Sequence, residues 1–511
     1  MPKQTTFFPF IFHLQTVLML VCLFTGVGFS QDQPAEPGPA LNPGLPWPAM
    51  DALKRELPLA EEVGGPKAGR FVGIFYFLWH DQHGDTNLGP FDISKIMAEN
   101  PMALDDPGAP QWGSVGQMHY WGEPLFGYYH SADPWVIRRH AHLLADAGVD
   151  TLIFDTTNAF TYKNVYMVLC EVFTQIRKEG GRTPQLSFMV NTNAGQTATE
   201  IYNDLYKPGL YQDLWFRWQG KPLLICDPKE ASDEVRAFFT LRKAHWPFQM
   251  VNTPYAWHWE ATYPQPYGYT EDPEKPEQVN VSVAQNLRQQ DGKVTDMSRG
   301  DARGRSFHQK HLSTHFWSVN LGLNFQEQWS RAFELDPPFV MVTGWNEWIA
   351  GEWSRPDAAR VFVDQFDQQT SRDIEMMKGG HGDNYYWQLV ANVRRYKGVP
   401  ALPKAGGAAA ISAGAGFGRW REVQPEFTDP DGDTLPRDHK GAGKTWYKMP
   451  AGRNELRLAK VAYDENNLYF YMQTREPISS WKDANWMLLF IDIDADHKTG
   501  WQGFDYVINR S

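Results

Sequence analysis

Short apolar runs alternate with segments of helical spacing between about residues 68 and 400. The runs are rich in β-branched and aromatic residues, which predicts strands. Segments such as 133–148 and 164–181 lie between them, have helical spacing and end in Gly, which predicts helices. The predicted strands are RFVGIFYFLW (70–79), VDTLIFDTTN (149–158), PQLSFMVNTN (184–193), KPLLICDP (221–228), FQMVNTPYAW (248–257), QVNVSVAQN (278–286) and PPFVMVTGWNEW (337–348).

Repeated strand–helix alternation predicts a parallel sheet. Seven or eight units favour a (β/α)₈ barrel of the TIM type over a doubly wound sheet, and we place this α/β barrel at residues 67–400. The eighth strand is the least distinct, and RVFVDQFD (360–367) is its candidate.

Several of these strands change abruptly from apolar to polar residues where they end. Val149 to Phe154 are apolar or β-branched, and Asp155, Thr156, Thr157 and Asn158 follow directly. A strand that is buried on both faces loses its apolar character at its end, and barrel active sites lie at the carboxyl ends of the strands. The same change occurs before Asn191, Asn193, Asp227, Asn252 and Glu347.

The segments outside the barrel have their own patterns. Residues 1–30 combine Lys3, an apolar stretch and a small-x-small site at Gly28–Ser30, which predicts a cleaved signal peptide, with a retained membrane anchor as the alternative. Residues 31–66 are Pro-rich and are expected to form a linker or strap. The long loop 80–132 is rich in aromatic residues and is expected to cover part of the active-site end.

An Ala/Gly linker (401–416) precedes a strand-rich region (417–511). Its alternating runs, separated by Asn-Asn and Gly signals, predict an all-β sandwich domain. A strand-like run reaches Ser511, which leaves open whether this domain continues.

Composition narrows the class of function. The net charge is −12 and we find no cluster of Lys and Arg, so nucleic acid and anionic membranes are not expected as main partners. Trp (21), Tyr (21) and Phe (31) are abundant, which suits the apolar faces of sugars but equally suits a core. Cys170 and Cys226 lie in apolar runs, so we expect buried thiols rather than a disulfide, and no Cys-based metal site. The mature protein is expected to be soluble and secreted, in an extracellular or periplasmic location.

GWNEWIAGEW (344–353) holds the most suggestive chemistry in the chain. Glycoside hydrolysis uses two carboxyl groups, one as acid and one as base or nucleophile. Glu347 lies at a strand end between two tryptophans, where desolvation would raise its pKa. Glu352 in the same segment, or the distant Asp155, is the candidate partner. Structural carboxylates are the alternative interpretation of all three.

Other residues near the strand ends are candidates for sugar binding. Tryptophan rings would stack on sugar faces, whereas asparagines and histidines would contact hydroxyls; the asparagines could instead cap helices. The histidines also suggest a metal-dependent enzyme, although none of them forms a helical zinc motif. The candidates are Trp79, His80, His119, Tyr120, Trp121, Asn158, Asn191, Asn193, Trp257, His258, Trp345, Asn346 and Trp348.

In the C-terminal region Asp492, Asp494 and Asp496 alternate and Gly500 follows. The ligand type suits Ca²⁺, but the downstream Glu of an EF-hand is missing, so a structural Ca²⁺ site competes with a solvated turn. No cofactor is expected for catalysis. Trp481, Trp486 and Trp501 would form a sugar-binding platform or a β core.

Trp345-Asn346-Glu347-Trp348 resembles the WNEW-x-EG signature of glycoside hydrolase family 99. That resemblance implies a secreted or Golgi (β/α)₈ enzyme. The characterised members of the family cleave α-mannosides with retention, so it also implies this activity. It also implies that Glu347 acts as a base toward the sugar 2-hydroxyl. The family's general acid, three residues later, falls on Ala350, which cannot transfer a proton; Glu352 lies two residues further on. Residues 486–510 resemble family 9 carbohydrate-binding modules.

The leading hypothesis is therefore a secreted glycoside hydrolase that acts on a polysaccharide or glycan and carries a C-terminal carbohydrate-binding domain. A catalytically silent glycan-binding protein is the second, because Ala350 replaces the expected acid. A metal-dependent polysaccharide-active enzyme is the third. The sugar, the linkage and the oligomeric state stay open.

Overall fold

The computed structural model describes residues 41–509 except 107, 115, 248, 249, 356, 357, 413–415, 485, 495, 497 and 502. The predicted signal peptide (1–30) and the first part of the predicted strap lie outside the described residues. Among the described helices, none is both long and apolar enough to cross a bilayer.

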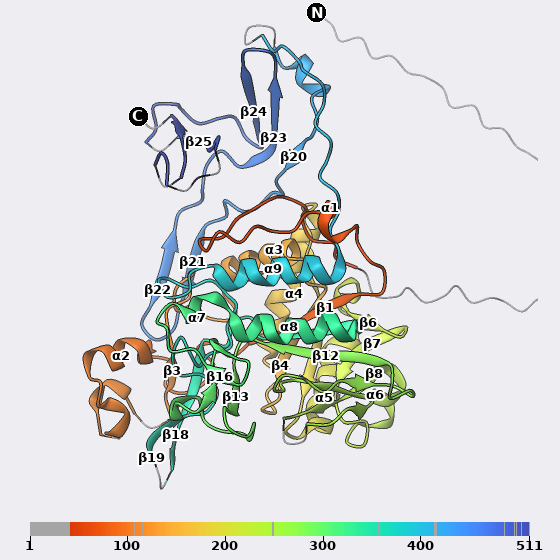
Figure 1. The fold of residues 1–511 in the computed structure, drawn as a ribbon, viewed down its shortest axis with the longest axis vertical. Helices are drawn as coiled ribbons and strands as arrows, with labels where there is room; N and C mark the ends of the chain where they lie inside the picture. Colours follow the sequence, from red (N-terminus) through yellow and green to blue (C-terminus); the bar gives the residue numbers. More distant parts are fainter. Residues whose placement is uncertain are drawn as a thin grey trace, which may run out of the picture. The chain divides into compact units, whose positions relative to one another are not determined.

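A parallel, nearly closed barrel forms the centre of the fold (Figure 1). Parallel pairing runs from β1 through β4, β5, β7 and β8 to β10 on one side, and from β1 through β17 to β12 on the other. Most of these strands are buried along their whole length, as the apolar runs predict. The strands are β1 (Phe71–Tyr76), β4 (Thr151–Thr156), β5 (Gln185–Val190), β7 (Lys221–Ile225), β8 (Thr240–His245), β10 (Ala256–His258), β12 (Pro276–Ser282) and β17 (Phe339–Thr343).

A side chain bridges the seam between β10 and β12. Gln278 accepts a hydrogen bond from the His258 backbone N–H at 2.8 Å, and its amide donates to the His258 carbonyl at 2.9 Å. The amide thus supplies both bonds that a neighbouring strand would make. Short strands continue the sheet beyond β12 and β7: β11 (Gly268–Tyr269), β9 (Thr253–Pro254) and β6 (Arg217–Trp218).

Helices connect the strands and cover the outside of the barrel (Figure 1). Asp133 caps α3 by accepting from Trp135 N at 3.0 Å, and Pro134 occupies the first turn, where it needs no N–H partner. The helices are α3 (Pro134–Asp146), α4 (Lys163–Lys178), α5 (Ala194–Ile201), α6 (Asp233–Phe238), α7 (Ser318–Leu321), α8 (Leu323–Leu335) and α9 (Asn384–Lys397).

The described part of the Pro-rich segment, which includes α1 (Ala60–Val63), is tied to the barrel. Asn42 N donates to Asp150 Oδ1 at 2.7 Å, and Lys397 of α9 reaches the other oxygen of the same carboxylate at 2.6 Å. Cys170 and Cys226 are buried and not disulfide-bonded, as expected.

The eighth-strand prediction was wrong. Part of 360–367 forms β19 (Ala358–Phe362), which pairs antiparallel with β18 (Ile349–Arg355) in a separate sheet of order β19-β18-β3-β2. The long first loop supplies β2 (Phe91–Asp92), β3 (Met118–Tyr120) and α2 (Ile93–Glu99). The missed barrel strand is β8, whose sequence TLRKAH alternates between buried and less buried positions and lacks an apolar run.

The C-terminal region is all β, but its described strands form three small sheets, β20-β23-β24, β21-β22 and β25-β26. The predicted sandwich is therefore not confirmed. The β21–β22 hairpin instead contacts the barrel: Arg437 donates to Asp133 at 2.7 Å, and Lys440 pairs with Asp81 at 2.8 Å. The strands are β20 (Phe427–Thr428), β21 (Arg437–Lys440), β22 (Trp446–Met449), β23 (Leu456–Tyr463), β24 (Leu468–Thr474), β25 (Leu489–Ile491) and β26 (Tyr506–Ile508).

Candidate active site

Glu347 follows β17 at the carboxyl ends of the barrel strands, which we call the mouth. Its Oε2 accepts hydrogen bonds from Gln365 Nε2 at 2.6 Å and from Arg372 Nε at 3.1 Å. The preceding residue, Asn346, fixes this segment to β1, because its Oδ1 accepts from Phe77 N at 2.9 Å and its amide donates to the Phe77 carbonyl. Hydrogen bonds therefore fix both the Glu347 carboxyl group and the segment of chain that carries it.

Arg372 joins Glu347 to two further carboxyl groups. Its Nη1 lies 3.4 Å from Glu260 Oε2, and its Nη2 lies 2.9 Å from Glu347 Oε2 and 3.9 Å from Asp364 Oδ1. The guanidinium also packs over the Trp259 ring, 4.9 Å from its centroid. Arg372 and Glu260 are fully buried, whereas 37% of the Asp364 side chain is exposed.

These carboxyl groups share raised pKa values. Burial raises the pKa of Glu347 well above its ordinary value, and the charges of Asp364, Asp373 and Asp155 add to this shift while Arg372 opposes it. Burial likewise raises the pKa of Glu260 to about 7. The pKa of Asp364 is also raised by desolvation. One guanidinium thus faces three carboxyl groups, and burial disfavours the charged form of each of them.

Asp155 is the last residue but one of β4 and lies close to this group. Its Oδ1 accepts from the Thr157 backbone N–H at 3.0 Å and from the Thr157 hydroxyl at 2.7 Å. Burial raises the pKa of Asp155 to about 6, and the charge of Asp364 adds to the shift. Asp155 and Glu347, which come from opposite halves of the sequence, are thus within electrostatic reach of each other.

Glu352 does not join them. It lies on β18, where it forms an ion pair with Arg360 of the same hairpin. Among the described residues, no hydrogen bond or ion pair connects Glu352 to Glu347, so the structure gives no support to pairing them. Ala350 is fully buried on the same strand, opposite His119.

Four of the tryptophans predicted to stack on sugars are buried in the core. Trp348 is stacked on Trp121 with ring centroids 4.9 Å apart, and its indole N–H donates to Glu375 at 2.6 Å. Trp257 packs on Phe339, the first residue of β17, with centroids 4.2 Å apart. The prediction was therefore wrong for residues whose faces are already covered by protein: Trp121, Trp257, Trp345 and Trp348 are all 0% exposed.

The predicted histidines are also buried in structural contacts. His80 shares a hydrogen bond of 2.9 Å with Ser131, His119 contacts the Trp112 carbonyl from β3, and His258 lies at the barrel seam. Burial lowers their pKa values to about 3, 4 and 3, so they are neutral. Tyr120 is buried as well, and its hydroxyl donates to the Tyr129 carbonyl. Within the described chain, no metal-type grouping includes these histidines.

The three predicted asparagines follow strands and are exposed, whereas Trp79 is buried. Asn158 donates to the Tyr162 hydroxyl at 2.6 Å, and Asn191 accepts from Trp246 Nε1 at 2.9 Å; both asparagines are exposed, as is Asn193 at the start of α5. Trp79 follows β1 and is 8% exposed. The indole N–H groups of Trp79 and Trp259 are buried and have no hydrogen-bond partner among the described residues.

Sequence reasoning missed Glu260, Asp364, Gln365 and Arg372. Glu260 had a usable signal, since it follows the aromatic run AWHW at the end of β10 just as Glu347 follows β17. The other three come from the segment VDQFDQQTSRD. Asp364 directly follows the apolar run of the predicted eighth strand, whereas Gln365 and Arg372 have no such signal.

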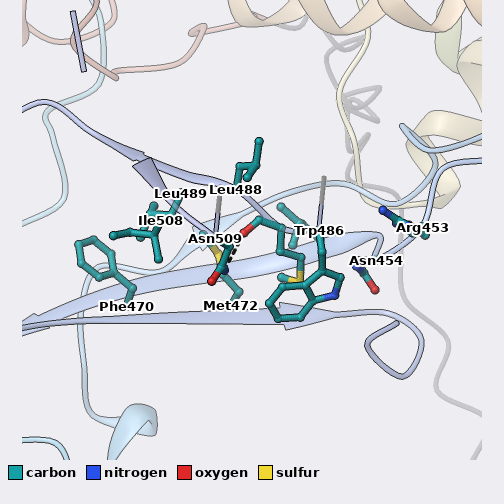
Figure 2. Close-up of a pocket in the computed structure, with 11 residues that line it drawn as sticks. Arg453, Asn454, Phe470, Met472, Trp486, Leu488, Leu489, Ile508 and Asn509 are labelled. Atoms are coloured by element: carbon teal, nitrogen blue, oxygen red, sulfur yellow. Dashed lines mark hydrogen bonds between the residues drawn. The ribbon is translucent and has the colours of Figure 1, made fainter. Parts of the chain in front are cut away.

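The C-terminal region carries a different acidic group and an apolar hollow. Carboxylate oxygens of Asp492, Asp494 and Asp505 lie within 4.8 Å of one another, so Asp505 takes the place predicted for Asp496. Ca²⁺ at this group stays a prediction. The hollow has a volume of about 340 Å³ and is lined by residues of β24, β25 and β26. Trp486, Phe470, Met472, Leu489 and Ile508 are among its lining residues (Figure 2).

No protein-family model and no curated protein matches this chain. Two solved structures of the GH99 endo-α-mannosidase from Bacteroides thetaiotaomicron are similar to this chain. The first, in complex with Bis-Tris-propane, has 12% sequence identity and a TM-score of 0.37, and the match covers 64% of this chain and 97% of that one. The other has 13% identity and a TM-score of 0.36 over 64% and 98%. We therefore infer function from this chain's own residues.

Proposed function

We propose that this chain is a glycoside hydrolase that cleaves glycosidic bonds in a polysaccharide or glycan by carboxyl acid–base chemistry. The observation that carries the proposal is the convergence of Glu347, Glu260 and Asp364 on one buried guanidinium at the mouth of a parallel barrel, with Asp155 within electrostatic reach of Glu347. Glycoside hydrolysis requires one carboxyl that holds a proton and one that does not, and neighbouring acids with raised pKa values meet this need.

Glu347 is the catalytic carboxylate in this proposal. Arg372 and Gln365 both donate to its Oε2, which favours the anion, while burial raises its affinity for a proton. An anion that binds a proton well is an effective base. The unpartnered indole N–H groups of Trp79 and Trp259 and the exposed Asn158 and Asn191 supply donors and acceptors for sugar hydroxyls.

Secretion and sugar binding by the C-terminal region belong to the same proposal. The pattern of residues 1–30 supports export, and exposed aromatic residues support a glycan-binding surface: Trp481 is 71% exposed and Trp501 is 45% exposed. Ala350 at the position of the expected acid favours a second candidate, a glycan-binding protein without catalysis.

One comparison separates the two candidates. The purified protein and its Glu347→Gln variant are incubated with a panel of polysaccharides and glycans, and released reducing ends are measured. The proposal expects release by the wild type and a loss of about 10²–10⁴-fold in the variant, with an unchanged melting temperature. Binding without release by the wild type would favour the second candidate, and full activity of the variant would remove Glu347 from the mechanism.

A further inference from the structure

Trp246 directly follows β8 and reaches over the mouth of the barrel towards β5. Its indole N–H donates to Asn191 Oδ1 at 2.9 Å. Asn191 directly follows β5, and β7 lies between β5 and β8 in the sheet. The bond therefore spans the carboxyl end of β7 and holds the Trp246 ring in one orientation. Trp246 is partly exposed and Asn191 is exposed, so a ligand can reach both.

The Trp246 ring belongs to an aromatic layer inside the mouth. It packs on Trp259, which follows β10, with ring centroids 5.0 Å apart, and Trp259 packs edge-to-face on Phe75 of β1 with centroids 6.1 Å apart. Strands β1 and β10 are not neighbours in the barrel, so Phe75 and Trp259 meet in its interior. Phe75 and Trp259 are buried, and Trp246 is therefore the ring of this layer that is open to a ligand.

This layer touches the group of acids described above. The Trp259 ring lies under the Arg372 guanidinium, 4.9 Å from its centroid, and Arg372 donates to Glu347 Oε2 at 3.1 Å. One ring and one guanidinium thus connect Trp246 to Glu347. A glycan of several sugar units that reaches the acids also passes over Trp246.

Hydrogen-bond donors beside the Trp246 ring point to an oxygen-rich ligand. The Trp259 indole N–H is buried and has no partner among the described residues. The Asn191 oxygen accepts from Trp246, whereas its amide N–H groups donate to no other described residue. A buried donor without a partner carries a desolvation cost, which a sugar hydroxyl would relieve. An apolar face with a few placed polar groups is the usual composition of a small-molecule site.

The charges at the mouth indicate which kind of sugar fits. Four carboxyl groups lie near one arginine, and the nearby Lys243 is paired with Asp227 at 2.7 Å. A uronic acid or sulfated sugar would bring a further anion to these acids, and like charges repel, whereas an uncharged sugar carries no such cost. The carboxyl groups are those of Asp155, Glu260, Glu347 and Asp364, and the arginine is Arg372.

We propose that Trp246, held by Asn191, is a sugar-binding platform at the mouth of the barrel. Its ring stacks on the apolar face of an uncharged sugar unit, and the Trp259 N–H and the Asn191 amide donate to the hydroxyls of that unit. Because the ring is already fixed by the bond to Asn191, little freedom is lost on binding. The inference rests on the proposed glycan substrate, but not on its hydrolysis.

The test measures glycan affinity after the aromatic face is removed. Wild type, Trp246→Leu, Trp246→Phe and Asn191→Ala are titrated calorimetrically with oligosaccharides from mannan, xylan, starch and polygalacturonate. Trp246→Leu keeps an apolar group against Trp259 but lacks a flat face, so its affinity for the neutral oligosaccharide that the wild type binds should fall about 10–100-fold. KM should rise by a similar factor while kcat changes much less. Trp246→Phe should recover most of the affinity, and Asn191→Ala should show a smaller loss than Trp246→Leu.

Trp353→Ala is the matched control, because Trp353 is 61% exposed and lies on β18, outside the barrel sheet. Melting temperatures establish that each variant is folded. Unchanged affinity of Trp246→Leu, an equal loss in Trp246→Phe or Trp353→Ala, tighter binding of the polygalacturonate oligosaccharides, or no binding by the wild type would each overturn the inference.

Failure of the proposed function gives a different result. A wild type that binds a neutral oligosaccharide without releasing reducing ends, and loses that binding in Trp246→Leu, supports the platform and overturns hydrolysis. Hydrolysis that is unaffected in Trp246→Leu supports the proposed function and overturns the platform.

Discussion

Arg372 Nε donates a hydrogen bond to Glu347 Oε2 across 3.1 Å, and neither side chain is more than 5% exposed. The arginine lies in a segment after the second sheet, and the glutamate follows the last barrel strand. The bond therefore ties the loop that carries Asp364 and Gln365 to the mouth of the barrel. Both the stability of the mouth and its proton affinity depend on this pair.

Replacing Arg372 by Leu is expected to destabilise the protein by about 3–5 kcal/mol at pH 8, because Glu260 and Glu347 are then buried without a cation. Arg372 lowers the pKa values of both acids, so its loss raises them further. An acid whose folded pKa is raised contributes stability at low pH that is lost as pH rises through the folded pKa. Urea unfolding should therefore show a smaller penalty at pH 5 than at pH 8. An equal penalty at both pH values, or a Lys substitution as harmful as Leu, would contradict this account.

Asp155→Asn is expected to change the pH dependence of stability. The pKa of Asp155 is raised from an ordinary value of 3.8 to about 6. Its contribution to stability is therefore full below 3.8 and is lost as pH rises to about 6, a change on the order of 2–3 kcal/mol. The Asn amide still accepts from Thr157 but cannot ionise, so the variant should gain stability relative to the wild type across this window. Denaturant unfolding at pH 4, 5, 6 and 7 measures the difference, and a difference that does not change with pH would contradict the prediction.

The β21–β22 hairpin gives a prediction about the first loop of the barrel. Arg437 and Asp133 form an ion pair in which both side chains are at least 97% buried, and Asp133 also caps α3. Arg437→Met should cost about 3–5 kcal/mol, because it leaves the Asp133 carboxylate buried without its cation. Lys163→Met, which removes a partner of Asp204 at an exposed pair, should cost no more than about 1 kcal/mol. Chemical denaturation compares the two, and similar costs would mean that the hairpin contact contributes little.

The sequence predicted the parts of the site that lie on buried strands and failed for the parts that do not. Asp155 could be found because it directly follows an apolar run, and Glu347 because it comes a few residues after one. Strand β8 was missed because a charged residue, Arg242, interrupts its apolar pattern. Arg242 can lie inside the fold because it forms an ion pair with Glu277. Arg372 and Asp364 reach the mouth from an irregular segment, and only the folded chain brings that segment to β17.

Tryptophan shows a second limit of sequence reasoning, because the same residue type serves a core and a sugar platform. Trp257→Ala should destabilise the protein by about 3–5 kcal/mol, since its ring is fully buried against Phe339 and its N–H donates to Glu277 at 3.0 Å. Trp353→Ala should change stability by no more than about 0.5 kcal/mol, because Trp353 is 61% exposed. Urea unfolding of the two variants, with near-UV circular dichroism as a check of packing, measures both effects. A Trp257→Ala protein with wild-type stability and weakened glycan binding would restore the original prediction that this ring stacks on sugar; the burial of its faces argues that stability is lost instead.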